Sequence, residues 1–190
     1  MVLLGGYTME ETQLKQLIHQ IKYLGDYNSP NISDPVTLRS SIMPRLTWDA
    51  AWLEEILNIE VPPDLRILWD ETSGLALFAD IVAGQSGLVI WSPEQTSIRH
   101  QYYVSIRQSK IALPTRKPLL FAGGDLCIGE FLGDDELLVI RCDPTSSDFG
   151  SILIALSLDP RDEWYNPASS LGEFLQSFVE AHGEKFWEVH

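Results

Sequence analysis

Apolar residues recur at helical spacing near the start of the chain and predict an amphipathic helix over residues 9–24. Thr8 and Glu11 have the spacing of a capping box, which satisfies free backbone N–H groups in a first helical turn. The apolar face of this helix is formed by Leu14, Leu17, Ile18, Ile21 and Leu24. Residues 25–46 contain three prolines and many small polar side chains, which favours an irregular connector. We therefore expect residues 1–46 to be an appendage of helix and connector, followed by a main domain over residues 47–190.

Two more helices are predicted directly after this connector. Thr47 can cap the first, which ends at Val61-Pro62-Pro63 because proline disfavours helix in the residue before it. Its expected apolar face consists of Trp48, Ala51, Trp52, Ile56 and Ile59. The two prolines and Asp64 suit the first turn of the second helix, and Gly74 suits its end. The apolar face of the second helix consists of Leu65, Leu68 and Trp69.

Strand-like runs take over in the rest of the chain. Short strands are predicted at 75–78 and 87–91, and Ser92-Pro93-Glu94-Gln95 then starts a helix that reaches about Gln108. From Leu119, apolar runs separated by Gly, Asp, Pro and Ser predict consecutive strands of one sheet; they read LLFA, DLCIGEFL, ELLVIRC and SILIALSL. Ser170 and Glu173 cap a closing helix, which should cover the sheet. Its apolar face is Leu171, Phe174, Leu175, Phe178 and Val179.

The charge of the chain restricts its partners. With 27 acidic and 13 basic residues, the formal net charge is -14, so nucleic acids and anionic lipid surfaces are repelled and a basic partner is favoured. Cys127 and Cys142 lie in apolar runs and are expected to be buried reduced thiols, as in a cytoplasmic protein. No apolar run is long enough to span a bilayer, and the first residues lack the basic region of a signal peptide.

The stretch FAGGDLCIG, residues 121–129, has the glycines of a phosphate loop but not its other residues. A Walker-type loop needs a lysine and a hydroxyl residue at the start of a helix, whereas Gly123 and Gly124 lead into Asp125 and a strand-like run. The carboxylate would repel phosphate, and the glycines do not follow the dinucleotide spacing. We expect a turn or bulge at this position.

Catalytic and metal-binding patterns are absent from the sequence. The histidines, His19, His100, His182 and His190, form none of the pairs HxH, HxxxH or HExxH that bind zinc. No serine lies in a GxSxG motif, and no other nucleophile has a base beside it. We therefore predict no catalytic residue, no metal site and no cofactor.

Acidic and aromatic residues are the candidates for a binding surface. One group is Asp134, Asp135 and Glu136, between two predicted strands; Asp143 and Asp148 follow the next strand. Carboxylates in turns are usually solvated surface, and the alternative is a docking face that steers a basic partner. Trp164 and Tyr165, beside further acids at Asp159, Asp162 and Glu163, could anchor such a partner by contact area.

The order of these pieces resembles the SUKH superfamily, the group around fungal Smi/Knr-type cell-wall regulators. The resemblance lies in WLEEILNIEVPPDLRILWDETSG (residues 52–74), LLFAGGDLCIGEFL, GSILIAL and ASSLGEFLQSFVE, and covers about residues 47–182. It implies an α+β fold in one main domain, with a mixed or largely antiparallel sheet of about 4–6 strands covered by helices. Ser73-Gly74 stands where the family usually has Asn-Gly, and residues 1–46 have no counterpart in it.

The resemblance also implies a non-enzymatic function. Bacterial members are largely immunity proteins that neutralise toxins, often nucleases, and an acidic protein can block the basic cleft of a nuclease. The leading hypothesis is therefore a cytoplasmic, antitoxin-like immunity protein with a basic toxin domain as partner. The alternative is a regulatory or scaffolding protein that recruits a partner through its N-terminal helix. A small-ligand protein or an enzyme is a third hypothesis, which the missing catalytic pattern disfavours.

Overall fold

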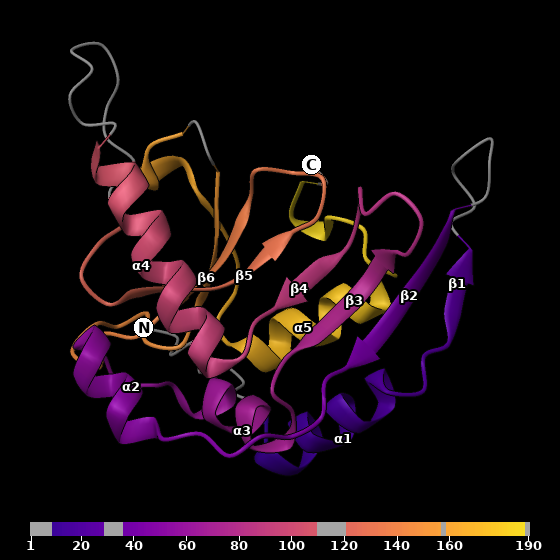
Figure 1. Cartoon of the computed structure of the whole chain (residues 1–190), viewed down its shortest axis with the longest axis horizontal. Coiled ribbons are helices and arrows are strands. Elements are labelled where there is room, and N and C mark those ends of the chain that lie inside the picture. The colour runs from indigo at the N-terminus through magenta and orange to yellow at the C-terminus, as the bar shows by residue number, and fades with distance from the viewer. Residues whose placement is uncertain (1–8, 29–35, 110–120, 157–158, 189–190) are drawn as a thin grey trace, which may run out of the picture.

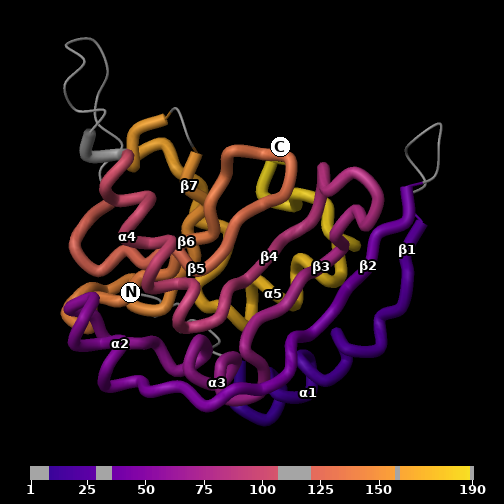
Figure 2. The backbone as a smooth tube through the Cα atoms, viewed as in Figure 1, coloured from indigo at the N-terminus to yellow at the C-terminus, as the bar shows by residue number. Residues whose placement is uncertain are grey.

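The fold is built on one antiparallel sheet. The computed structural model describes residues 9–28, 36–109, 121–156 and 159–188. Eight strands lie in the sheet in their order along the chain, each antiparallel to the next. They are β1 (Asp26–Asn28), β2 (Thr37–Ile42), β3 (Leu75–Asp80), β4 (Leu88–Ile90), β5 (Asp125–Phe131), β6 (Leu137–Arg141), β7 (Ile152–Ala155) and β8 (Tyr165–Ala168). Figure 2 shows the path of the chain from β1 to β7 in this order. The α+β class is thus confirmed, and the sheet is larger than the expected size of about 4–6 strands.

Helices cover both faces of this sheet. The helices are α1 (Glu11–Ile21), α2 (Ala50–Leu57), α3 (Pro63–Glu71), α4 (Pro93–Ser109) and α5 (Leu171–Glu180), with short 3₁₀ turns η2 (Arg161–Glu163) and η3 (Phe186–Glu188). In Figure 1, α4 lies in front of the sheet and α5 behind it. Apolar side chains of α1, α3 and α5 belong to the larger core cluster, and Tyr103 of α4 packs on a smaller cluster. None of the described helices is both long and apolar enough to cross a membrane.

The central strands are mostly apolar because both of their faces are buried, and the buried charges Asp125 and Arg141 lie at strand ends. On β6, Leu138 and Ile140 belong to the larger core, whereas Leu137 and Val139 belong to the smaller one. Successive side chains of a strand point to opposite faces, so most positions of a strand that is covered on both sides are apolar. The runs DLCIGEFL, ELLVIRC and SILIALSL form β5, β6 and β7, as predicted, although residues 157–158 of the last run are outside the described part. In LLFA, residues 119–120 are also outside it, and Phe121 and Ala122 belong to no strand.

The N-terminal segment differs most from its prediction. Residues 25–46 are not an irregular connector, because β1 and β2 lie there and pair with each other and with β3. The helix begins with Glu10 as N-cap, whose partner in the capping box is Gln13; Thr8 lies outside the described residues. The apolar face of α1 is buried in the larger core together with α3 and α5. The helix is therefore part of the main core rather than an appendage.

Helix α2 buries a different face from the one predicted. Its N-cap is Asp49, whose side chain accepts a hydrogen bond from the backbone N–H of Trp52, and Thr47 lies outside the helix. Leu53 is fully buried, whereas Trp52 and Ile56 are 45% and 48% exposed. Two large apolar side chains of the expected core face thus lie on the surface.

Other local predictions are confirmed. Helix α4 begins where Ser92 caps it, and α5 begins with Ser170 as N-cap, which accepts a hydrogen bond from the N–H of Glu173. The glycine pair of FAGGDLCIG forms a turn before β5, and Gly124 has φ of +81°. A Cβ atom on Gly124 would lie 2.7 Å from Cβ of Asp143, so glycine is required there by conformation and by space.

Candidate protein-binding surfaces

The first acidic group lies in the turn between β5 and β6 and is bound to a lysine. Lys185 Nζ lies 2.8 Å from Glu136 Oε2 and 3.2 Å from Asp134 Oδ2. Burial lowers the pKa of Lys185, but the hydrogen bonds and charges of Glu136 and Asp134 outweigh this effect and raise it. Asp135 is exposed. Two of the three carboxylates therefore help to hold the C-terminal segment on the sheet.

The second acidic group lies in the loop between β6 and β7. Asp143 accepts hydrogen bonds from the backbone N–H and the hydroxyl of Thr145, and these bonds hold its pKa below the usual value. Asp148 accepts hydrogen bonds from the Ser146 hydroxyl and from Arg141 Nε, the latter at 3.1 Å. Both side chains thus shape their own loop.

Trp164 and Tyr165 are less accessible than a binding anchor requires. Trp164 is buried over the smaller core, where its indole N–H donates to the Asp159 carbonyl oxygen at 3.3 Å. Tyr165 is half-buried and packs against the larger core. Asp162 and Glu163, in η2, are exposed.

The structure does not gather the predicted acidic residues into one cluster. Strand β6 separates the turn of residues 134–136 from the loop of residues 143–148. Its five residues span on the order of 15 Å at the usual rise of a strand. The two groups therefore border opposite ends of β6.

A groove between α2 and the start of α4 combines aromatic and acidic side chains. We call it the α2–α4 groove; its volume is about 270 Å³, and the residues that line it are Leu46, Thr47, Trp48, Asp49, Trp52, Trp69, Ser73, Ser92, Pro93 and Glu94. The Trp48 indole N–H donates to Asp70 Oδ1 at 3.0 Å, and the Trp69 indole N–H donates to the Trp91 carbonyl oxygen at 2.9 Å. The Trp48 and Trp69 rings meet edge to face at 5.2 Å. These contacts fix two of the three tryptophans, whereas Trp52 extends from α2 with nearly half of its surface exposed.

The charge of the α2–α4 groove is negative. Its lining residues include the exposed carboxylates of Asp49 and Glu94 and no lysine, arginine or histidine. The N-termini of α2 and α4 contribute partial positive charge, but each carries less than one unit and faces one of these carboxylates. An indole face beside a carboxylate is a favourable site for a lysine or arginine side chain.

Sequence reasoning missed this groove because it assigned Trp52 and Ile56 to the core. A signal was present, since the apolar residues of α2 are spread around the helix rather than confined to one stripe. Ala51, Trp52, Leu53, Ile56 and Leu57 cannot all face the sheet. Some of them had to be exposed, and exposed large apolar groups are candidates for binding.

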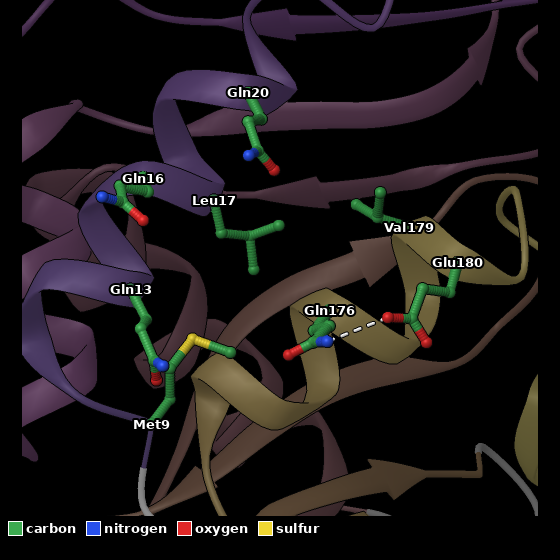
Figure 3. Close-up of a pocket in the computed structure, with 8 residues that line it drawn as sticks. All are labelled: Met9, Gln13, Gln16, Leu17, Gln20, Gln176, Val179 and Glu180. Atoms are coloured by element: carbon green, nitrogen blue, oxygen red, sulfur yellow. Dashed lines mark hydrogen bonds between the residues drawn. The ribbon is translucent and has the colours of Figure 1, made fainter.

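A second groove lies between α1 and α5 and is lined mainly by amides (Figure 3). Gln13, Gln16 and Gln20 extend from α1, and Gln176 of α5 donates a hydrogen bond to Glu180 at 2.9 Å. Leu17 and Val179 lie between the two helices. This lining has little charge to select a partner.

The cysteines and histidines do not form a reactive centre within the described residues. Both cysteines are buried and neither belongs to a disulfide, as expected, and burial raises the pKa of the Cys142 thiol. The described residues, which do not include His190, contain no group of three or more His, Cys, Asp or Glu side chains that could hold a metal ion. His19 contacts Tyr23, and His182 stacks on Tyr27.

His100 should make the stability of the protein depend on pH. Its Nδ1 accepts a hydrogen bond from the Cys127 backbone N–H at 3.2 Å, and burial lowers the pKa of the imidazole to about 4. In the unfolded chain the His100 imidazole binds a proton near its ordinary pKa of about 6.5, whereas in the folded protein it does so only near pH 4. The stability that this difference contributes is therefore fully present above about pH 6.5 and is lost as the pH falls toward about 4. Between about pH 7 and pH 5 we expect the free energy of unfolding to fall by about 2 kcal/mol.

Urea denaturation at these two pH values tests this expectation. The His100→Gln variant should be less stable at neutral pH and should lose less stability on acidification than the wild type. An equal loss in both proteins would contradict the assignment to His100.

Comparison with protein families identifies the larger part of the chain. Residues 48–177 match the model of the SMI1 / KNR4 family (SUKH-1). A comparison with curated proteins gives no match. The matched range contains α2 to α4, both acidic segments and most of α5, whereas α1, β1 and β2 precede it. The match confirms the resemblance found in the sequence, and the chain therefore belongs to the SMI1/KNR4 family (SUKH-1).

Proposed function

We propose that this protein is a non-enzymatic binding module of the immunity type, which neutralises a basic protein toxin in the cytoplasm. The observation that carries the proposal is membership of a family that includes immunity proteins, in a chain with a net charge of -14. A toxin that cleaves nucleic acid needs a positively charged cleft, and an acidic protein can occupy that cleft. The electrostatic attraction would act mainly on the rate of association.

We further propose that the α2–α4 groove is the anchoring point of this partner. Binding energy in protein interfaces is concentrated in a few aromatic and arginine side chains near the centre. Trp52 is such an aromatic group, and Asp49 and Glu94 lie beside it to pair with a lysine or arginine of the partner. The acids Asp134, Asp135, Glu136, Asp143 and Asp148 are proposed as outer positions that steer the partner.

The test of the function is co-expression with toxins encoded next to the gene, followed by a growth assay and a pull-down. The proposal expects growth to be restored by one of these combinations, with recovery of a stable complex. If no neighbouring product binds or is neutralised, the immunity function is wrong.

In such a complex, Trp52→Ala should weaken binding by about 30-fold or more, as expected for a central aromatic anchor. Because Trp52 is nearly half exposed, its removal should cost less than about 1 kcal/mol of folding stability. The affinity can be measured by calorimetry and the stability by urea denaturation.

Tyr102→Ala is the matched control, because Tyr102 is an exposed aromatic residue of α4 that does not line the groove. It should leave the affinity unchanged. If the complex forms and both variants bind like the wild type, the anchor lies elsewhere, and the loops at the ends of β6 are the next candidates.

A further inference from the structure

Two cations in the described part of this acidic protein have no acidic partner among the described residues. Among the lysines and arginines whose side chains the structure describes, all form ion pairs except Lys22 and Arg45; the paired ones are Lys15, Arg39, Arg66, Arg99, Arg141, Arg161 and Lys185. With 27 acidic residues in the chain, a cation without a carboxylate beside it is unusual. Both unpaired cations are exposed, and both line the same groove.

This basic groove lies between α1 and the segment that follows β2. Its volume is about 520 Å³, and Lys22, Arg45 and Lys15 provide its positive charge. Lys15 Nζ lies 2.7 Å from Glu11 and 3.7 Å from Glu71, which is the only carboxylate among the lining residues. The lining as a whole is therefore positive, in contrast to the α2–α4 groove.

The groove also has an apolar component. Ile18 is buried, Ile42 packs on the larger core, and Met43 is 45% exposed. The backbone at Met43 is held on both sides: its N–H donates to the Gly74 carbonyl oxygen at 2.9 Å, and its carbonyl accepts from the Thr72 hydroxyl at 2.7 Å. Because the backbone of Met43 is already held in place, binding of a partner does not require this side of the groove to become ordered.

The groove also lies outside the part of the chain that defines the family. Helix α1 and residues 42–45 precede the matched range of 48–177. Helix α1 and Ile42 nevertheless pack into the same core, so the groove is a fixed part of this protein's surface. It can serve a partner different from the one proposed for the family region.

We propose that the basic groove binds an acidic peptide segment of a second protein, with carboxylates on Lys22 and Arg45 and apolar side chains on Met43. The mixed lining favours a segment that alternates acidic and apolar residues over a polyphosphate or a lipid headgroup. A nucleic acid or an anionic membrane would bring many negative charges close to a protein with a net charge of -14. A short segment places its few charges within a Debye length of the groove, about 8–10 Å, and avoids most of this repulsion.

The test uses the full chain and a short fluorescent peptide that alternates aspartate with leucine. Anisotropy should show binding that weakens as salt is added, and an asparagine–leucine peptide should bind at least tenfold more weakly. The Lys22→Gln/Arg45→Gln variant should lose at least tenfold in affinity for the aspartate peptide. Arg66→Gln, which removes an exposed cation outside the groove, should change the affinity less than twofold.

Three results would overturn this proposal. One is equal binding of the two peptides, or no binding of either. Another is equal affinity of the wild type and the double variant. The third is displacement of the peptide by inorganic phosphate, or binding to phosphatidylserine vesicles with the same dependence on Lys22 and Arg45, because the groove would then be a general anion site. Trp52→Ala should leave peptide binding unchanged, so failure of the toxin-binding proposal and failure of this one can be told apart.

Discussion

Replacing Asp125 with asparagine is expected to destabilise the fold by about 3–5 kcal/mol, because it removes a fully buried carboxylate and leaves the buried Arg141 with the more exposed Asp148 as its remaining counter-charge. The Asp125 side chain is 0% exposed and that of Arg141 is 7% exposed. Arg141 Nη1 lies 2.5 Å from one carboxylate oxygen, and Arg161 Nε lies 2.7 Å from the other. Since arginine stays protonated at any accessible pH, Arg141 cannot relieve the loss by becoming neutral.

Chemical denaturation of Asp125→Asn and of three further variants distinguishes the effect of losing the buried ion pair from the effect of losing an exposed charge. Arg161→Gln should cost less than Asp125→Asn, because Arg161 is 32% exposed and water can replace part of its bond. The Asp125→Asn/Arg161→Gln double variant should lose less stability than the sum of the two single variants, because both changes remove the same Asp125–Arg161 ion pair. Asp135→Asn, in the exposed β5–β6 turn, should stay within about 0.5 kcal/mol of the wild type. A cost below about 1 kcal/mol for Asp125→Asn would show that this ion pair does not support the fold.

Replacing Leu14 with alanine is expected to destabilise the protein by about 3 kcal/mol, through lost burial and the cavity that remains. Leu14 is 0% exposed on the face of α1 that packs into the larger core with α3 and α5. An appendage would give a different result, because its removal or weakening would leave the unfolding of the main domain unchanged.

Gln16→Ala is the control for helix propensity and surface position. Gln16 is exposed on the same helix, and its replacement should change stability by no more than about 0.5 kcal/mol. If Leu14→Ala has as small an effect as Gln16→Ala, α1 is not part of the cooperative core. With the expected result, α1 cannot serve as a separable recruiting arm, and a role in binding has to come from its exposed surface, such as the basic groove.

Local patterns determined much of the architecture. Helix α4 follows from the capping signal at its start, α3 from its starting prolines and apolar face, and α5 from its cap and apolar face; all of these signals act within a few residues. Strands β5, β6 and β7 follow from apolar runs long enough to be recognised without their neighbours. The family resemblance rests on the order of the same caps and apolar runs, and the family match over residues 48–177 confirms it.

Short and polar strands were beyond the reach of these patterns. Strand β1 has three residues, and β8 has four, including a proline. A strand of this kind is stabilised by pairing with its neighbour rather than by its own composition. The segments of β1 and β2 were therefore predicted to be a connector, and the predicted sheet had fewer strands than the observed one.

The sequence by itself determined the acidic charge, the central strands and the capped helices, because each depends on composition or on residues close together in the chain. Only the tertiary structure decided which side of α2 is buried, since apolar residues lie on more than one side of this helix. It also decided the sites: Asp125 bonds Arg161, 36 residues away in the chain, and Lys22 and Arg45 line one groove. These arrangements arise when segments that are distant in the chain pack together, and no local sequence pattern specifies the geometry of that packing.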